Sequence, residues 1–243
     1  MSSANAATGR AGRPRAMSES SLSTASALSP REQILDAAAA LFAEAGFAGT
    51  STRAIADRVG IRQQSLYYHF AGKDEILIEL LAETVRPSID FVAAIEARVP
   101  DDASAAAALF ALASIDARTL RRTPHNIGTL YLLPEVQDAR YDDFRQQRAL
   151  LRATYGRLGQ RAATPAVRAS LDEARIGAIL IQLAEIVIQL RRDGEPDAKD
   201  DETIAASCLR VLGVAADEIA AARRDAAEII AAVEADRFAN VAD

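Results

Sequence analysis

The sequence predicts an all-α protein, and three observations support that fold class. From Ser29 onward the chain is dominated by Ala, Leu, Arg, Glu and Gln, which are strong helix formers. Glycines and prolines stand at separated points where helices could end. No segment alternates apolar and polar residues as a half-buried β-strand does. With 243 residues, of which 50% are hydrophobic, the chain is long and apolar enough to bury a sizeable core.

Charge and cysteine content exclude several function classes. The chain has 28 basic and 34 acidic residues, so its net charge of −6 repels a polyanion and any nucleic-acid site must be local. The one cysteine, Cys208, excludes a disulfide within the chain and a cysteine-cluster zinc site, which fits a reducing cytoplasm. Because His69 and His125 are the only histidines, we expect no metal and no cofactor.

The N-terminal segment 1–29 is rich in Ser, Ala, Thr and Gly and poor in large apolar residues, so we expect a disordered tail. It lacks the apolar run that a secretory signal needs. The longest apolar run of the chain, Ile176–Leu190, is too short for a bilayer and contains Glu185. We therefore expect a cytoplasmic protein that does not enter the membrane.

The first helix is predicted to begin at the SPRE stretch. Ser29 suits the N-cap, Pro30 the first helical position, and Glu32 the third position of a capping box. Apolar residues then recur every three or four positions, as on one face of a helix: Ile34, Leu35, Ala38, Leu41, Phe42 and Ala45. Gly46 is expected to end this helix.

A second, short helix is expected in STRAIADRVG, capped by Ser51 or Thr52 and ended by Gly60. Its buried stripe would consist of Ile55, Ala56 and Val59. A third helix must begin within three residues of Gly60. Two short helices joined by so tight a glycine turn predict a helix-turn-helix unit.

The third helix lies in GIRQQSLYYHF and carries polar and aromatic residues that are expected to face outward. Leu66 and Phe70 are four residues apart and define its core side. At 100° per residue, the remaining side chains point away from that side or lie on its flanks: Gln64, Ser65, Tyr68, Tyr67 and His69.

Basic residues dominate this part of an otherwise acidic chain. Between Ser51 and Lys73 a single acid, Asp57, opposes four basic residues: Arg53, Arg58, Arg62 and Lys73. Glutamine can bond two atoms of adenine in the major groove, while Tyr, Ser and His side chains can bond phosphate oxygens. The sequence therefore predicts that the third helix contacts DNA.

The same region resembles the TetR family of bacterial regulators over about residues 31–80. The resemblance rests on twelve positions: Thr52, Ile55, Ala56, Gly60, Ile61, Leu66, Tyr67, His69, Phe70, Lys73, Ile76 and Leu77. It implies a DNA-binding head of three helices at 30–75 and a larger helical domain at 76–243 that binds ligand and dimerises. Most members of that family are repressors released by a small ligand.

The resemblance also implies a role for each position that matches the family's motif. Thr52 would touch a phosphate, as would Lys73 at the start of the fourth helix. Base edges would be met by Arg62, Gln63, Gln64 and Ser65. The DNA backbone would be gripped by Tyr67, Tyr68 and His69, with Tyr67 also near a base. Where the family commonly has Ser, this chain has Arg62, so the recognition helix lacks its usual cap.

The rest of the chain reads as further helices. A long helix from Asp74 toward Val99 contains Pro87, which should bend or interrupt it. Other helices are expected at about 102–122, 126–133, 138–162, 170–192, 201–213 and 215–238. The helix at 170–192 is apolar around much of its circumference, so a second surface must cover it.

In the TetR family the last two long helices pair with their copies, which makes 170–192 and 201–213 candidates for a homodimer interface. Its expected residues are Ile179, Leu183, Ile186, Val187 and Leu190. A dimer would carry two heads about one turn of DNA apart and would read a palindromic operator in double-stranded DNA.

Candidates for an inducer site are spread over the body. Phe110, His125, Tyr131 and Phe144 could line a cavity for a small molecule, but such residues are more often ordinary core, and His125 after Pro124 also suits a helix start. Gln182 and Glu185 lie inside an apolar helix and need partners, either across the dimer or on a ligand.

The sequence offers no catalytic constellation, since it has neither a phosphate-binding glycine loop nor a metal cluster nor a Ser/His/Asp set. It therefore predicts a non-enzymatic, ligand-responsive transcriptional regulator, most simply a repressor. The alternative is a helical interaction or adaptor protein without DNA readout. That alternative leaves Tyr67, Tyr68, His69 and Lys73 unexplained.

Overall fold

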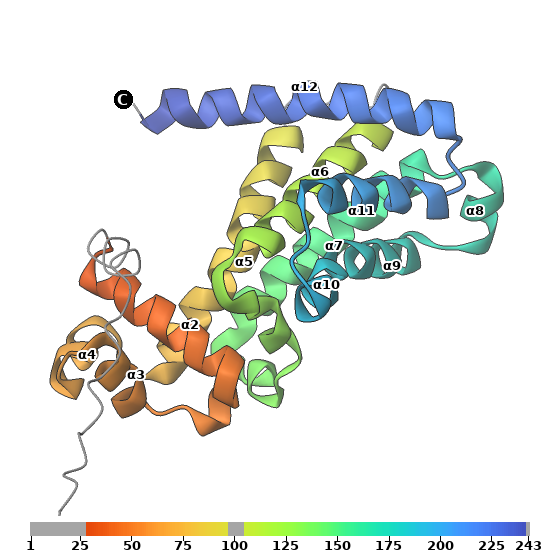
Figure 1. Ribbon diagram of the computed structural model, residues 1–243. Helices are drawn as coiled ribbons and strands as arrows, with labels where there is room; N and C mark the ends of the chain where they lie inside the picture. The colour runs from red at the N-terminus through yellow and green to blue at the C-terminus, as the bar shows by residue number, and fades with distance from the viewer. Residues whose placement is uncertain (1–27, 97–104, 242–243) are drawn as a thin grey trace, which may run out of the picture.

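The computed structural model describes residues 28–96 and 105–241, and in these ranges it is helical without any strand (Figure 1). The all-α prediction is confirmed. The expected tail at 1–29 lies outside the described residues except for its last two positions. The helices are α2 (Pro30–Gly49), α3 (Thr52–Val59), α4 (Gln63–His69), α5 (Lys73–Glu96), α6 (Ala105–Arg122), α7 (Asp142–Ala162), α8 (Pro165–Ser170), α9 (Glu173–Glu185), α10 (Val187–Asp193), α11 (Ala198–Val211) and α12 (Ala216–Val241), with 3₁₀ turns η1 (Pro124–Leu132), η2 (Pro134–Gln137) and η3 (Ala139–Tyr141).

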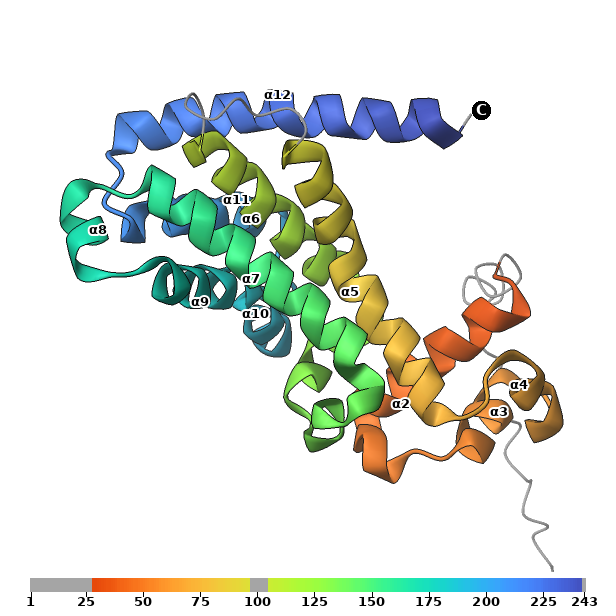
Figure 2. The same cartoon turned by 180° about the vertical axis from the view of Figure 1, so that it is seen from behind.

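The helices form a small head and a larger body (Figures 1 and 2). The helices α2, α3 and α4 gather at one end of the molecule, and α5 leads from them into the body. There α5, α6, α7, α9 and α11 pack on one another, and α12 lies across the end of the body that is farthest from α4. None of the helices in the described ranges is long and apolar enough to cross a membrane.

The start of α2 follows the sequence signal. The Ser29 hydroxyl accepts the backbone N–H of Glu32 at 3.3 Å, and the Glu32 carboxylate accepts the backbone N–H of Ser29 at 2.7 Å. Gly46, with a φ of 77°, kinks the helix, which makes one further turn to Gly49 instead of ending at Gly46. The Thr50 hydroxyl donates to the Gly46 carbonyl at 2.8 Å and holds this turn in place.

Two body segments differ in part from the expectations. The helix α5 continues through Pro87 without interruption, because it packs on α6 and α7, and these contacts outweigh the loss of one helical hydrogen bond. The helix expected at about 126–133 is present as the 3₁₀ helix η1. It begins at Pro124 and carries His125 and Asn126 at φ of 57° and 51°. Left-handed backbone at these positions prevents a regular α-helix.

The expected helix at 170–192 is broken into α9 and α10 at Ile186. Its first half packs very closely on α7. A Cβ atom added at Gly177 would lie 2.4 Å from the Arg152 carbonyl oxygen, so this crossing requires glycine. The close crossing sets the position of α9 against α7.

In the described part of the chain, buried side chains form two separate hydrophobic cores. The first joins the head to the beginning of α5, η1, α10 and the start of α7, with Leu66, Phe70 and Leu81 almost fully buried. The second joins the end of α5 to α6, α7, α9, α11 and α12. The head is therefore packed against one part of the body, formed by the beginning of α5, η1, α10 and the start of α7, which we call the lower body. The remainder of the body is the upper body.

Polar side chains inside the body are paired over long sequence distances. Asp116, only 2% exposed, accepts hydrogen bonds from the Ser88 hydroxyl at 2.9 Å and the Tyr155 hydroxyl at 3.1 Å. Burial raises the pKa of Asp116 to about 6, although these two hydrogen bonds oppose the shift. Arg121 and Asp201 form a bidentate ion pair at 2.9 and 2.8 Å between α6 and α11.

Candidate nucleic-acid interface

The turn between α3 and α4 is built on Gly60, which adopts φ 80° and ψ 26°. Its backbone N–H donates to the Ala56 carbonyl at 3.0 Å, and the N–H of Ile61 donates to the same carbonyl at 3.0 Å. Only glycine adopts this left-handed conformation without strain, so Gly60 fixes the angle at which α4 leaves α3. Arg62 occupies the N-cap of α4 without a side-chain hydrogen bond, as its type predicts.

The two faces of α4 differ sharply in exposure. Leu66 is 0% and Phe70 1% exposed, as their spacing predicts, whereas Tyr67 is 50% and Tyr68 88% exposed. Gln64 and Ser65 are also exposed. An aromatic ring as exposed as that of Tyr68 gains little from packing within its own chain, so this face is available to a partner.

Three of the sequence-predicted residues are joined at the edge of this face. The Gln63 amide nitrogen donates to the Thr52 hydroxyl at 2.9 Å and to the Tyr67 hydroxyl at 3.3 Å. The Thr52 and Tyr67 hydroxyls are 3.2 Å apart. These hydrogen bonds connect the start of α3 to α4 and hold Gln63 and Tyr67 in place before any partner is bound.

His69 and Lys73 lie behind the exposed face. The His69 ring is partly buried and meets the Tyr68 ring edge-on, with 5.4 Å between centroids. The Lys73 ammonium donates to the Phe47 carbonyl at 2.9 Å and the Thr50 carbonyl at 3.2 Å, and it lies 4.4 Å from the centroid of the Phe47 ring. Two of its three N–H donors are thus engaged with the end of α2, and one remains for a phosphate.

The positive charge of this region is partly neutralised from α2, which the spacing of residues could not reveal. Arg58 forms a bidentate pair with Glu44 at 3.0 and 3.2 Å, and its hydrogen bonds lower the pKa of Glu44. Arg53 lies 3.9 Å from Asp57. Arg62 is exposed and, among the described residues, makes no ion pair. Hydrogen-bond donors therefore define this surface more than net charge does.

The sequence of the head and the fold of the whole chain are both similar to those of known proteins. The sequence model described as "Bacterial regulatory proteins, tetR family" matches residues 34–80, which span α2, α3, α4 and the start of α5. Over nearly the whole fold, the chain is similar to AmtR of Mycobacterium smegmatis, with 40% identity, a TM-score of 0.71, and coverage of 81% of this chain and 93% of AmtR. The chain belongs to the TetR family.

Other members of the TetR family match over less of their length or at lower identity. The head is 53% identical over 53 residues to the transcriptional repressor KstR2 of Mycobacterium tuberculosis, a match that covers 22% of this chain and 26% of KstR2. The chain thus matches only about a quarter of the curated relatives' length. The fold is shared, at 18% identity and a TM-score of 0.56, with AibR in complex with isovaleryl coenzyme A and operator DNA. As a TetR family member, the chain is a regulatory protein and not an enzyme.

In the body of this TetR family member, four of the six predicted ligand-site residues come together. Tyr131, Phe144 and Gln182 line a cleft of about 290 Å³ between η1, α7 and α9. Glu185 lies beside it, because its carboxylate accepts hydrogen bonds from the Gln182 amide at 2.9 Å and from the Arg148 guanidinium. The cleft thus combines two aromatic rings with a connected set of polar groups.

Two residues that contact Tyr131 could not be identified from the sequence. The Arg148 guanidinium lies 4.6 Å from the centroid of the Tyr131 ring. The Tyr131 hydroxyl donates to the Thr84 hydroxyl of α5 at 2.6 Å, and burial raises the pKa of Tyr131 so that it stays protonated. Neither Arg148 nor Thr84 belongs to a local motif, and only the packing of η1 against α5 and α7 brings them together.

The other two ligand-site candidates lie elsewhere. Phe110 is on α6, and it lines a groove beneath α12. His125 is at the start of η1, where its Nε2 lies 2.9 Å from an oxygen of Asp36 on α2. His125 thus connects the lower body to the head and does not border the cleft.

The predicted dimer residues divide into exposed and buried positions. Ile179 is 41%, Ile186 43% and Leu190 37% exposed, and Leu183 is partly exposed. Val187 is fully buried in the first core of its own chain. The outward apolar stripe of α9 and α10 therefore contains Ile179, Leu183, Ile186 and Leu190.

Proposed function

We propose that this TetR family member is a sequence-specific DNA-binding transcriptional repressor that acts in the cytoplasm. The observation that carries the proposal is the outward face of α4, where Gln64, Ser65, Tyr67 and Tyr68 are exposed on a short helix fixed by Gly60. Such a helix fits the major groove, where amide and hydroxyl groups can bond base edges and phosphates.

In this proposal some residues of the head read base edges and others contact the DNA backbone. Gln64 and Ser65 read base edges together with Arg62, while Tyr67, Tyr68 and His69 contact the DNA backbone. Thr52 donates to a phosphate at the start of α3, where free backbone N–H groups favour an anion. Gln63 exchanges its bonds to Thr52 and Tyr67 for a base or phosphate, and Lys73 contributes its remaining donor.

The proposed protein is a homodimer that binds a palindromic operator. The outward stripe of α9 and α10 presents three large apolar side chains at 37–43% exposure, which a second copy would cover. We assign head functions to residues 30–75 and ligand binding and dimerisation to 76–243. The hydrophobic cores do not follow this functional boundary, because the first core contains residues of both 30–75 and 76–243.

The proposed effector is a small molecule that binds the cleft between η1, α7 and α9. Tyr131 and Phe144 offer apolar contact, and Gln182 offers hydrogen bonds. A ligand that draws Arg148 away from Glu185 would also shift the ring of Tyr131, which is bonded to Thr84 of α5. Because α5 leads directly into the head, this contact offers a physical route from ligand to operator binding.

Selection of bound duplexes from a random pool tests the proposal. The intact chain is expected to enrich a palindrome at near-physiological salt. A Tyr67→Ala, Tyr68→Ala variant should fail to retain it, because it loses two exposed contact groups, and circular dichroism checks that it is folded. Gln146→Ala, which changes an exposed residue on α7, serves as the control and should enrich the same palindrome. If folded, intact protein enriches no sequence, or if the double variant enriches it equally, the proposed DNA surface is wrong.

A further inference from the structure

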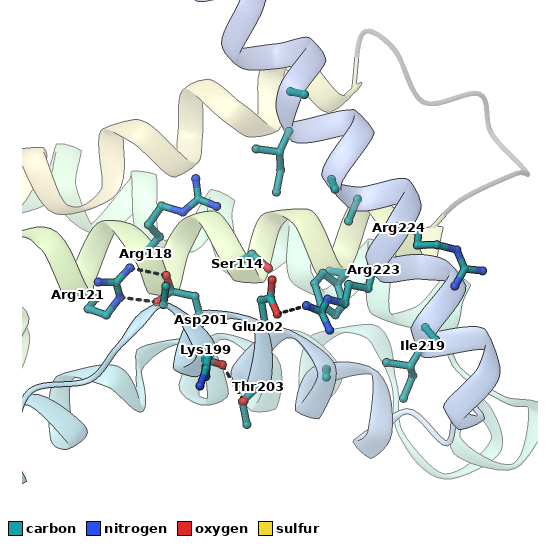
Figure 3. A pocket seen from close by; sticks show the side chains of 18 of the residues that line it. Ser114, Arg118, Arg121, Lys199, Asp201, Glu202, Thr203, Ile219, Arg223 and Arg224 are labelled. Atoms are coloured by element: carbon teal, nitrogen blue, oxygen red, sulfur yellow. Dashed lines mark hydrogen bonds and ion pairs between the residues drawn. The ribbon is translucent and has the colours of Figure 1, made fainter.

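A second, larger cavity lies at the opposite end of the molecule from α4. Helices α6, α11 and α12 line an open groove of about 1120 Å³ (Figure 3). It shares no lining residue with the cleft beside Tyr131. Its position under α12, far from the head, separates it from the proposed DNA surface (Figure 1).

The lining of this groove is basic although the protein as a whole is acidic. Among the described residues, three acids line it, Asp201, Glu202 and Glu234, against seven basic residues: Arg118, Arg121, Arg122, Lys199, Arg210, Arg223 and Arg224. The net charge of the chain is −6, so this concentration of positive charge runs against the overall composition. Inside a groove with low-dielectric walls, this charge produces a stronger positive potential, which attracts an anionic ligand.

Each acid of the lining is already paired. Asp201 binds Arg121, Glu234 accepts from Arg118 at 3.3 Å, and Glu202 lies 2.5 Å from Arg223. The four remaining basic residues are exposed and form no ion pair with any acid in the described ranges: Arg122, Lys199, Arg210 and Arg224. The groove therefore keeps an excess of uncompensated positive charge.

A buried hydroxyl on α6 lacks a partner in the same groove. Ser114 is 4% exposed, and its Oγ has no hydrogen-bond partner among the described residues. Figure 3 places Ser114 in the groove between Arg118 and Arg223. A buried hydroxyl is normally satisfied, because leaving it without a hydrogen bond costs free energy, so the position favours a bound acceptor.

Apart from Thr203, the rest of the lining consists of apolar side chains. Phe110 lies one helical turn before Ser114 on α6, and Ile219 and Ile230 face the groove from α12. Small side chains of α12 also line the groove, at Ala220, Ala227 and Ala231. The groove thus joins an apolar wall to a polar centre with excess positive charge.

We propose that this groove binds an amphipathic organic anion, namely a carboxylate or phosphate attached to an apolar body. The anionic group accepts a hydrogen bond from Ser114 and lies between Arg118 and Arg223. The apolar body extends along Ile219 and Ile230 of α12. Because the Arg118–Glu234 pair is partly exposed, with side chains 32% and 51% accessible, an entering anion can compete with Glu234.

Calorimetric titration of the full chain with octyl phosphate tests this site. Inorganic phosphate tests the anion alone, and octyl glucoside tests the same apolar chain on a neutral head. We expect octyl phosphate, below its micelle concentration, to bind at least about tenfold more tightly than either, since only it satisfies both halves of the groove. No binding of octyl phosphate, or equal binding of octyl glucoside, would overturn the proposal.

Two groove variants and one control variant test whether octyl phosphate binds in the groove. Ser114→Ala should weaken octyl phosphate about fivefold, because it removes one hydrogen bond of roughly 1 kcal/mol, while leaving thermal stability unchanged or higher. Arg118→Gln should weaken it about tenfold or more. The matched control, Arg168→Gln, changes an exposed arginine of α8 and should bind as the wild type does. Unchanged affinity in both groove variants, or a groove that a second copy covers so that the dimer binds no probe, contradicts the assignment.

Discussion

The outward face of α4 and the interior of the body both carry polar side chains, but they hold them in opposite ways. On α4, Tyr68 is 88% exposed, and Gln63 is bonded only to neighbours on the same surface. Inside the body, Asp116 and Asp201 are 2% and 3% exposed and are bonded to residues far away in sequence. Polar groups on α4 are thus available to a partner at little cost to folding, whereas those in the body fix the packing of helices.

The largest effect is expected from separating the buried ion pair of the body. Arg121→Met leaves the Asp201 carboxylate, whose side chain is 5% exposed, without its partner. We expect this change to lower the free energy of unfolding by about 3–5 kcal/mol, measured by urea denaturation. The double variant Arg121→Met, Asp201→Leu should recover most of the loss. A loss below about 1 kcal/mol in the single variant would show that the body tolerates unpaired charge as the α4 surface does.

The buried carboxyl group of Asp116 should give the next largest effect, and it depends on pH. Its pKa is about 6 in the folded chain against an ordinary value of 3.8, so the folded state binds the proton more tightly. Its contribution to stability is complete below about pH 4 and is lost as the pH rises through 6. A shift of about 2 pH units corresponds to about 3 kcal/mol.

Asp116→Asn removes that titration. The unfolding free energy of the variant, relative to wild type, should therefore rise by up to about 3 kcal/mol between pH 4 and pH 7. Comparing the two proteins at each pH cancels the titration of all other carboxylates. If the difference stays constant over this range, Asp116 does not titrate as a buried group.

On the α4 face, substitution should change recognition without changing stability. Gln64→Ala should reduce discrimination at one base pair of the operator by roughly 1–3 kcal/mol, measured by competition between operator variants. The unfolding free energy should remain within about 0.5 kcal/mol of wild type, because Gln64 is exposed. An equal loss of affinity for every sequence would contradict a base-reading role.

The smallest effect is expected at a position of the head that is structural in spite of its exposure. The Ser51 hydroxyl accepts the backbone N–H of Ala54 at 3.1 Å and caps α3. Ser51→Ala should lower the unfolding free energy by about 1 kcal/mol in urea denaturation and leave base preference unchanged. A changed base preference would show that the capping residue also contacts DNA. Structural polar groups and DNA-contacting polar groups would then not be separate sets.

The features that sequence analysis predicted correctly depend on short-range signals. Ser29 and Glu32 form the expected capping box, Gly60 makes the expected left-handed turn, and Leu66 and Phe70 are buried. Each of these features follows from residue type and from spacing within about one helical turn. The start of α2 and the turn between α3 and α4 were therefore predictable, whereas the end of α2 lies three residues beyond the expected Gly46.

The features that could not be predicted depend on contacts between segments far apart in the chain. Glu44 neutralises Arg58 from another helix, and Lys73 is bonded to carbonyl groups at the end of α2. The cleft partners Arg148 and Thr84 meet Tyr131 only because α5, η1 and α7 pack together. Periodicity reveals which face of a helix is apolar, but it does not identify the segment that this face meets.

The division of the interior into two cores has a mechanical consequence for α5. Its first half, through Val85, belongs to the core shared with the head, and its second half, from Phe91, belongs to the upper body. Pro87 lies between these halves, at the position where the helix lacks one backbone donor. Along α5, the change from one core to the other therefore falls at Pro87 and not at the boundary proposed between the two functional domains.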